Sequence, residues 1–88
     1  MTDERSTVEH DKRMGERVKA RRRELGMSQE HLADRIGVTF QQIQKYENGI
    51  NRMAASRLYQ IAVALELPLT QFFDRHKLVN PDGARLFK

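Results

Sequence analysis

Glutamine, lysine and phenylalanine gather on a short stretch of the chain, TFQQIQKYENG (residues 39–49), whose first acidic residue is Glu47. Glutamine pairs bidentately with adenine, lysine donates to guanine, and phenylalanine contacts the thymine methyl group. Acidic side chains among them would be repelled by the phosphates that flank a DNA groove. The stretch therefore predicts that base edges in a major groove are read by four residues: Phe40, Gln41, Gln44 and Lys45.

Two short helices separated by a glycine are predicted to carry these side chains. Ser28 and Thr39 have the side-chain oxygens that cap helix N-termini. Gly37 lies between the two helices, and we expect the second helix to cover about residues 40–48. Such a pair of helices with a glycine turn is typical of a helix-turn-helix motif.

The turn and the inner faces of this pair meet the packing needs of the motif. Gly37 adopts a positive φ without steric cost, and the small side chain of Ala33 lets the second helix cross closely over the first. Apolar residues occupy the expected inner faces at Leu32, Ile36, Val38, Ile43 and Tyr46. The pattern also leaves open an ordinary pair of antiparallel helices whose glutamines are simply solvated.

The flanking sequence predicts three more helices and no strand. The first helix begins at about residue 12, carries Met14, Val18 and Leu25 on one face, and ends before Gly26. A fourth helix is expected over about residues 54–65, and a short fifth helix follows Pro68. We expect a flexible N-terminal tail at 1–11, a DNA-binding domain at 12–76 and a C-terminal tail at 77–88.

Composition limits the classes of function. The chain of 88 residues has room for one small domain, and a net charge of +4 favours polyanionic partners. It contains no cysteine, which excludes disulfides, thiolate zinc sites and thiol nucleophiles. No apolar run approaches the ~20 residues that span a bilayer, and the charged N-terminus lacks the apolar core of a secretory signal. We therefore expect a cytoplasmic, nucleoid-associated protein with no membrane partner.

Catalytic and metal-binding patterns are not evident. His10, His31 and His76 are scattered, and no nearby acids complete a metal-ligand spacing. No paired carboxylates, Ser-His-Asp arrangement or phosphate-binding glycine loop appears. The sequence predicts a protein that is not an enzyme, with no metal, no cofactor and no small-molecule ligand.

The segment SQEHLADRIGVTFQQIQKYENG (28–49) resembles the lambda-repressor-like, or Xre-type, helix-turn-helix family of bacterial and phage regulators. The resemblance extends over about residues 15–73, through RRRELGMSQ before the motif and ASRLYQIAVALELPLTQFF after it. It implies an all-α, compact five-helix domain with the helix-turn-helix at helices 2 and 3. It further implies a transcriptional regulator that binds double-stranded operator DNA, usually as a homodimer.

The resemblance implies roles for individual residues. The positions that face bases match the four residues of the second helix named above. Arg22 and Glu47 match a salt bridge between the first and third helices, and Phe40 stands where several phage repressors have a polar group. Contacts to DNA phosphates are expected from Arg22, Gln29, Thr39, Asn48, Asn51 and Arg52.

The apolar residues near the end of the domain allow two interpretations. Leu69, Phe72 and Phe73 are expected at a dimer interface, mainly through the resemblance, although a small domain also needs such residues for its core. Three other functions stay open. They are an antitoxin with a protein partner, a restriction-modification controller protein, and a helical domain that binds no DNA.

Overall fold

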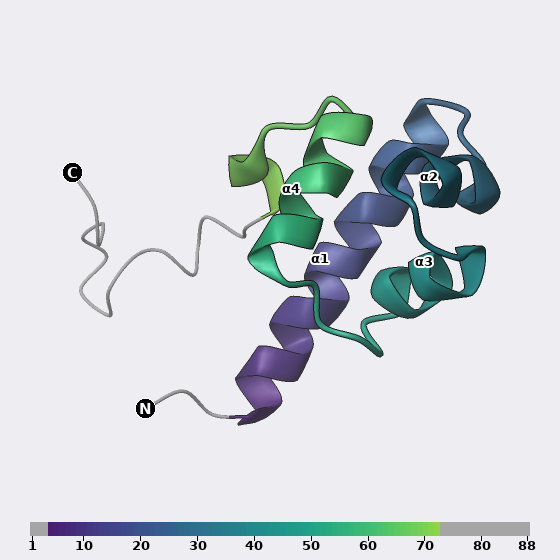
Figure 1. The fold of residues 1–88 in the computed structure, drawn as a ribbon. Coiled ribbons are helices and arrows are strands. Elements are labelled where there is room, and N and C mark those ends of the chain that lie inside the picture. Colours follow the sequence, from purple (N-terminus) through teal and green to yellow (C-terminus); the bar gives the residue numbers. More distant parts are fainter. Residues whose placement is uncertain (1–3, 73–88) are drawn as a thin grey trace.

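The computed structural model describes residues 4–72, which form four α-helices and one short 3-10 turn (Figure 1). The elements are α1 (Glu4–Glu24), α2 (Gln29–Ile36), α3 (Phe40–Glu47), α4 (Ala55–Ala64) and η1 (Leu69–Phe72). Within this range there is no strand, and the predicted all-α class is confirmed. The fifth predicted helix is present only as the 3-10 turn η1. The predicted tail at 77–88 lies outside the described residues.

The first helix begins earlier than the sequence predicted. Residues 4–11, which were expected to belong to a flexible tail, form the first two turns of α1. No glycine or proline precedes Gly15, so this stretch contains no residue that breaks a helix. The charge-rich composition suggested a tail, but it is equally suited to the solvated faces of a long helix.

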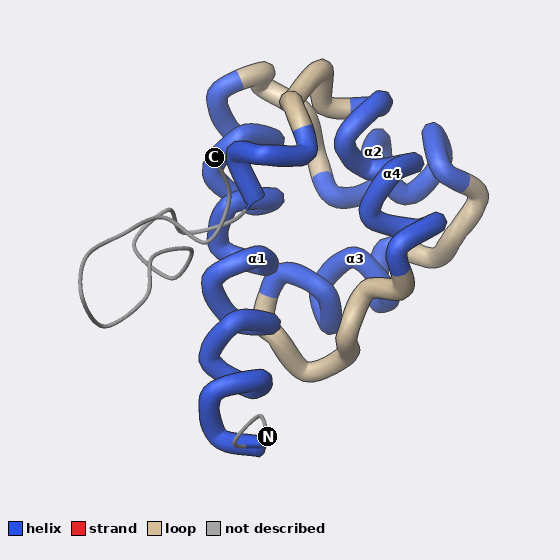
Figure 2. Tube along the Cα trace, turned by 90° about the vertical axis from the view of Figure 1, so that its left-hand side faces the viewer, coloured by secondary structure: helices blue, strands red, loops and turns tan. Residues whose placement is uncertain are grey.

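The long helix α1 packs against α3 and η1, whereas α4 packs against α2 and η1. The helices α2 and α3 also pack against each other, so the four helices surround a common centre (Figure 1). Figure 2 shows α3 crossing beside the middle of α1, with α4 close to α2. Each helix contributes to a shared centre in which five side chains have no exposed surface: Val18, Leu32, Ile43, Ile61 and Leu65.

The turn after α1 decides which apolar side chain enters this core. Leu25 was predicted to share one helix face with Met14 and Val18, but 38% of it is exposed. Gly26 follows with a φ of 67°, and this left-handed residue redirects the chain so that Met27 is buried instead. Met53 also joins the core from the segment before α4, although no helical periodicity marked either methionine.

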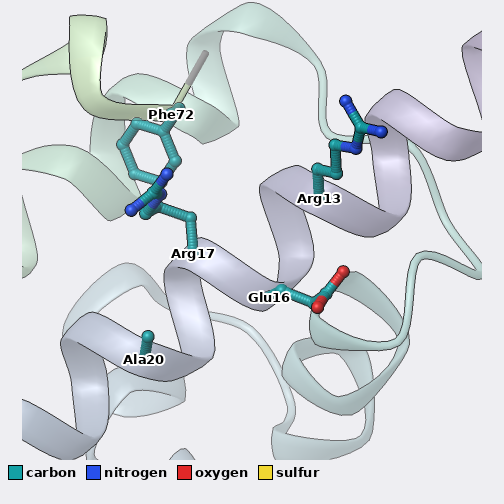
Figure 3. Close-up of a pocket in the computed structure, with 5 residues that line it drawn as sticks. All are labelled: Arg13, Glu16, Arg17, Ala20 and Phe72. Carbon is teal, nitrogen blue, oxygen red and sulfur yellow. The ribbon is translucent and has the colours of Figure 1, made fainter. Parts of the chain in front are cut away.

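The 3-10 turn η1 closes the side of the core between α1 and α4. Phe72 is only 3% exposed and lines a shallow pocket on α1 together with Arg17 and Ala20 (Figure 3). Arg21 of α1 donates from Nε to the carbonyl oxygen of Leu65 at 2.9 Å, so the last turn of α4 is also tied to α1. These contacts hold η1 and the end of α4 against α1.

Candidate nucleic-acid interface

The turn between α2 and α3 has the geometry that the sequence predicted. Ser28 Oγ accepts a hydrogen bond from the backbone N–H of His31 at 2.9 Å, and Thr39 Oγ1 accepts one from the N–H of Gln42 at 3.2 Å. Gly37 has a φ of 74° and a ψ of 35°, which is the left-handed conformation that ends α2. Both N-caps and the glycine turn are therefore confirmed.

The same turn brings the two helices together around a small side chain. Ala33 is 2% exposed, and its carbonyl oxygen accepts the N–H of Val38 at 3.0 Å across the turn. Glu30, Asp34 and Phe40 line a shallow groove between α2 and the start of α3. The predicted role of Ala33 in allowing close approach agrees with this burial.

The outer face of α3 is polar and free of acid. Its inner face buries Ile43, Tyr46 and Glu47 in the protein. Four side chains remain on the exposed face, and they are the residues that were predicted to meet base edges: Phe40, Gln41, Gln44 and Lys45. The side chains that carry the predicted chemistry are thus exposed to solvent.

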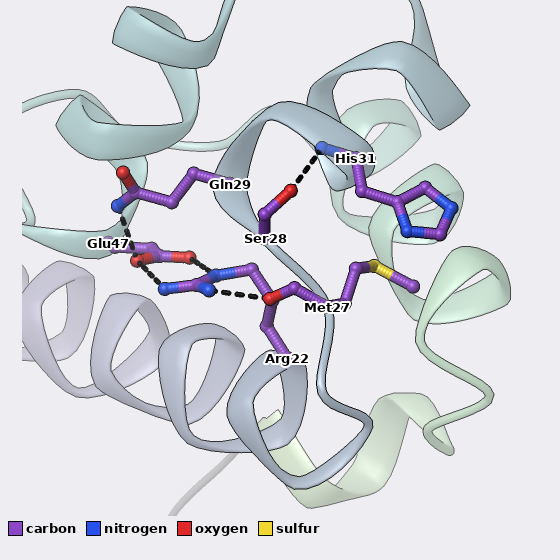
Figure 4. A network of polar contacts seen from close by, with 6 residues as sticks. All are labelled: Arg22, Met27, Ser28, Gln29, His31 and Glu47. Atoms are coloured by element: carbon purple, nitrogen blue, oxygen red, sulfur yellow. Dashed lines mark hydrogen bonds and ion pairs between the residues drawn. The ribbon is translucent and has the colours of Figure 1, made fainter.

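A buried ion pair fixes α3 against α1 (Figure 4). Arg22 donates from Nε to Glu47 Oε2 at 2.7 Å and from NH2 to Glu47 Oε1 at 3.1 Å. The side chains of Arg22 and Glu47 are only 9% and 1% exposed. This bidentate geometry limits rotation of both side chains, so the predicted salt bridge between the first and third helices is present in the structure.

The network extends to the start of α2 (Figure 4). The remaining terminal nitrogen of Arg22, NH1, donates to the carbonyl oxygen of Met27 at 2.7 Å, and Gln29 Nε2 donates to Glu47 Oε1 at 3.0 Å. One carboxylate therefore joins the end of α1, the first residue of α2 and the last residue of α3. The three helices that build the candidate interface share this anchor.

This network changes the role expected for Arg22. The residue was also predicted to contact a DNA phosphate, but each of its three guanidinium nitrogens donates inside the protein. Its side chain is almost completely buried, and its ion pair holds Glu47 and the end of α3 in place. Gln29 is half-buried, and the Nε2 that would face a phosphate is engaged by Glu47.

The segment after α3 exposes the other predicted phosphate contacts. Asn48 forms the C-cap of α3, and Asn51 and Arg52 follow it, all three with exposed side chains. Gly49 has a φ of 71°, and the N–H of Ile50 donates to the carbonyl oxygen of Lys45 at 2.9 Å. These backbone contacts end the helix and turn the loop back toward α1. Thr39, also predicted to meet phosphate, is exposed at the other end of α3.

Two residues of α1 contribute to this region and were not identified from the sequence. Gly15 is packed so closely on α3 that a Cβ atom there would lie 2.6 Å from the carbonyl oxygen of Glu47. Asp11 accepts a hydrogen bond from Arg52 Nε at 3.1 Å. The absence of glycine and proline before Gly15 was the available signal that α1 could extend far enough to place Asp11 there.

The residues expected at a dimer interface are divided by the structure. Leu69 is 42% exposed, whereas Phe72 is buried in the monomer core and is only 3% exposed. Phe73 lies outside the described residues. Other exposed apolar side chains occur on α4, where Tyr59 and Val63 are 60% and 59% exposed.

Residues 4–72 contain no cluster of three or more histidine, aspartate or glutamate side chains arranged to hold a metal ion. Nor does any helix in this range combine the length and apolar character needed to cross a bilayer. The exposed face of α3 and its neighbouring loop are the best-supported site in the described structure.

The sequence is closely similar to bacterial regulators. It is 59% identical over 68 residues to an uncharacterized transcriptional regulator in the ATPase CF(0) region of Rhodospirillum rubrum, covering 76% of this chain and 63% of that protein. It is 53% identical over 64 residues to an HTH-type transcriptional regulator of Sinorhizobium medicae (strain WSM419), covering 73% of this chain. The chain spans 63% and 46% of the lengths of these two relatives.

Solved structures share the fold at lower identity. The restriction-modification controller protein C.AhdI from Aeromonas hydrophila superposes with a TM-score of 0.71 at 24% identity, over 75% of this chain and 96% of that chain. The biofilm regulator SinR, solved in complex with DNA, gives a TM-score of 0.64 at 24% identity, over 69% and 98% of the two chains. The fold also forms part of an enzyme, the hydroxypropylphosphonic acid epoxidase from S. wedmorenis, with a TM-score of 0.69 at 24% identity over 74% of this chain and 35% of the enzyme.

The family assignment rests on more than half of the chain. A model of the helix-turn-helix family HTH_3 matches residues 18–72, which include α2, the glycine turn, α3 and the loop that follows. The capped helices, the left-handed Gly37 and the close relatives agree with this match. The chain belongs to the HTH_3 helix-turn-helix family.

Proposed function

We propose that the protein is a sequence-specific DNA-binding transcriptional regulator and that α3 is its recognition helix. The observation that carries the proposal is the outer face of α3, where exposed glutamine and lysine side chains are presented without any acid. The buried pair of Arg22 and Glu47 supports it, because base recognition requires a helix held in a fixed orientation. The regulators among the relatives support the same function.

In the proposed complex, α3 enters the major groove. Gln41, Gln44 and Lys45 meet base edges, and Phe40 contacts a thymine methyl group because its side chain has no hydrogen-bonding atom. The loop after α3 holds the DNA backbone through Asn48, Asn51 and Arg52, with Thr39 at the opposite end of the helix. Backbone contacts of this kind set the register and orientation of the protein, whereas the base contacts specify sequence.

A twofold dimer completes the proposal. Two copies of α3 would occupy half-sites about 34 Å apart along one face of the duplex, so the operator would be palindromic. The exposed Leu69, Tyr59 and Val63 are apolar surface available for contact with a second copy. Occupation of a promoter would give repression, and contact with polymerase would give activation. We place such a regulator in the cytoplasm, with the nucleoid, and assign it no catalytic activity.

The test separates base reading from backbone binding. In-vitro selection of duplexes followed by sequencing would supply an operator, on which Gln41→Ala is expected to lose about 1–3 kcal/mol of binding free energy and to relax preference at one base pair. Arg52→Ala is expected to weaken binding to all sequences about equally and to reduce the salt dependence. Gln71→Ala, at an exposed glutamine of η1, is the matched control and should change neither quantity.

The outcome that contradicts the proposal is equally specific. If the protein selects no duplex above random sequence, or if Gln41→Ala and Arg52→Ala give the same profile across operator variants, α3 does not read bases. A pull-down of a protein partner together with failed selection would favour the antitoxin alternative instead. Sedimentation of the free protein and of its operator complex tests the homodimer. A complex with one copy of the protein per operator would exclude the homodimer.

A further inference from the structure

The side chain of Arg52, which is proposed to contact a DNA phosphate, is held by one carboxylate of α1. Its Nε lies 3.1 Å from Asp11 Oδ2 and 3.4 Å from Asp11 Oδ1. Among the side chains of residues 8–72, Arg52 has no other hydrogen bond, so none of them engages its two terminal nitrogens. A guanidinium group has five N–H donors in a fixed plane, and four of them belong to these terminal nitrogens. Asp11 thus occupies one edge of the group and leaves the other edge for a ligand.

The two members of the pair differ in exposure. The side chain of Asp11 is 13% exposed, whereas that of Arg52 is 62% exposed. The carboxylate is therefore the fixed member, packed at the junction of α1 with the loop, and the arginine reaches from it toward solvent. A free arginine side chain samples many rotamers, and their loss opposes every contact that it makes.

The backbone at this junction is in close contact, so the pair does not depend on side-chain reach alone. A Cβ atom at Gly49 would lie 2.7 Å from Lys12 Cγ and 2.8 Å from Lys12 Cα, which means that the loop lies directly against α1 next to Asp11. Figures 1 and 2 both show the loop after α3 passing beside the N-terminal half of α1. The early start of α1, at Glu4, makes this half helical.

From this geometry we infer that Asp11 is a positioning residue for DNA binding: it holds Arg52 by Nε so that the terminal nitrogens of the guanidinium face a DNA phosphate. The inference rests on the proposed function, since it needs Arg52 to contact DNA. Two parallel N–H donors match two phosphate oxygens, and a charged acceptor on the opposite edge keeps the plane in orientation. Asp11 itself does not touch the DNA.

The alternative to positioning is that Asp11 weakens DNA binding by electrostatic repulsion. A carboxylate near DNA also repels phosphates, and if this were its main effect, removing its charge would strengthen binding. Positioning predicts the reverse sign for Asp11→Ala. It also predicts that the loss depends on Arg52, because an acid that acts only through the arginine has no influence once the arginine is gone.

A double-mutant cycle on the selected operator tests the inference. Arg52→Ala is expected to lower affinity about tenfold, the lower end for a hydrogen bond to a charged group, and to reduce the salt slope by about one. Asp11→Ala is expected to lower affinity about two- to fivefold, as for ordering an exposed ion pair. The double variant should bind no more weakly than Arg52→Ala alone. Asp11→Asn, which keeps an acceptor oxygen, should recover part of the loss.

The matched control removes the same charge from the same region of α1. Glu9 is exposed and does not contact Arg52. The variant Glu9→Ala should therefore leave the affinity for DNA unchanged or raise it slightly. Thermal melting of each variant verifies that the fold is retained. As a readout that general destabilisation would not produce, the side-chain 15N relaxation of Arg52 Nε in the free protein should show greater mobility in Asp11→Ala than in wild type.

Each failure has a distinct meaning. If wild type selects no operator, the proposed function falls and the inference falls with it. If wild type binds but Arg52→Ala has no effect, α3 can still be the recognition helix, and only the positioning of Arg52 is excluded. If Asp11→Ala tightens binding, or weakens it equally with and without Arg52, repulsion or a structural role replaces positioning.

Discussion

At the scale of single residues, Glu47 is the most constrained side chain of the candidate interface. Its carboxylate is 1% exposed and accepts hydrogen bonds from Arg22 and Gln29. Removing charges from water is costly, so such a pair adds little net stability relative to apolar residues of similar volume. Loss of one member, however, leaves the other buried and uncompensated. The pair is therefore best understood as fixing the orientation of α3.

We expect Glu47→Ala to lower the free energy of unfolding by about 3–5 kcal/mol, because Arg22 would remain charged in a buried site. Urea denaturation measures this loss. Asp34→Ala removes an exposed acid from α2 and should change stability by no more than about 0.5 kcal/mol. The double variant Arg22→Met with Glu47→Leu should recover much of the loss. An unchanged midpoint for Glu47→Ala would contradict the buried clamp.

At the scale of elements, the packing of α1 on α3 depends on a glycine inside a helix. Gly15 lies in the middle of α1, where an alanine would ordinarily favour the helix by about 1 kcal/mol. A Cβ atom there would collide with the backbone carbonyl oxygens of Tyr46 and Glu47. The two helices can approach this closely only because no side chain separates them.

Gly15→Ala is accordingly expected to destabilise the protein by about 1–3 kcal/mol, as overpacking does, despite the gain in helix propensity. Chemical denaturation gives the magnitude, and amide chemical shifts of Tyr46 and Glu47 should move. Gly37→Ala serves as the comparison, because its space is open and its φ is 74°. That variant should lose about 1–2 kcal/mol from backbone strain alone, with smaller shifts at Tyr46 and Glu47. Increased stability of Gly15→Ala would show that the helices are not in direct contact.

At the scale of the whole molecule, the core is completed by η1, which is a short 3-10 turn rather than an α-helix. The turn η1 inserts Phe72 against α1 and contacts α4. A domain of this size buries a modest core and has only about 5–15 kcal/mol of stability. One aromatic ring therefore accounts for a considerable share of the total.

Phe72→Ala should lower the free energy of unfolding by about 3–5 kcal/mol, as other truncations of buried aromatic residues do. Leu69→Ala, in the same turn but 42% exposed, should lose about 1 kcal/mol or less in the monomer. Melting at several protein concentrations tests the proposed dimer at the same time. If Leu69 contacts a second copy, its truncation should reduce the concentration dependence of Tm. Equal losses for the two variants would contradict the placement of Phe72 in the core.

The local features of this protein were determined by the sequence alone. Both N-caps, the left-handed Gly37, the apolar inner faces and the exposed residues of α3 follow from rules that act over three to five residues, such as hydrogen bonding to the first backbone amides of a helix. The ion pair of Arg22 and Glu47 could be predicted only from the family resemblance, because no local rule connects residues that are 25 positions apart.

Only the tertiary structure decided what depends on the meeting of distant segments. It placed Met27 rather than Leu25 in the core, assigned Phe72 to the monomer, and extended α1 to Glu4, where Asp11 meets Arg52. It also showed that the guanidinium of Arg22 is buried inside the protein, where it pairs with Glu47. The physical reason is that burial and ion pairing depend on which surfaces come into contact, whereas caps and turns depend on a few adjacent residues.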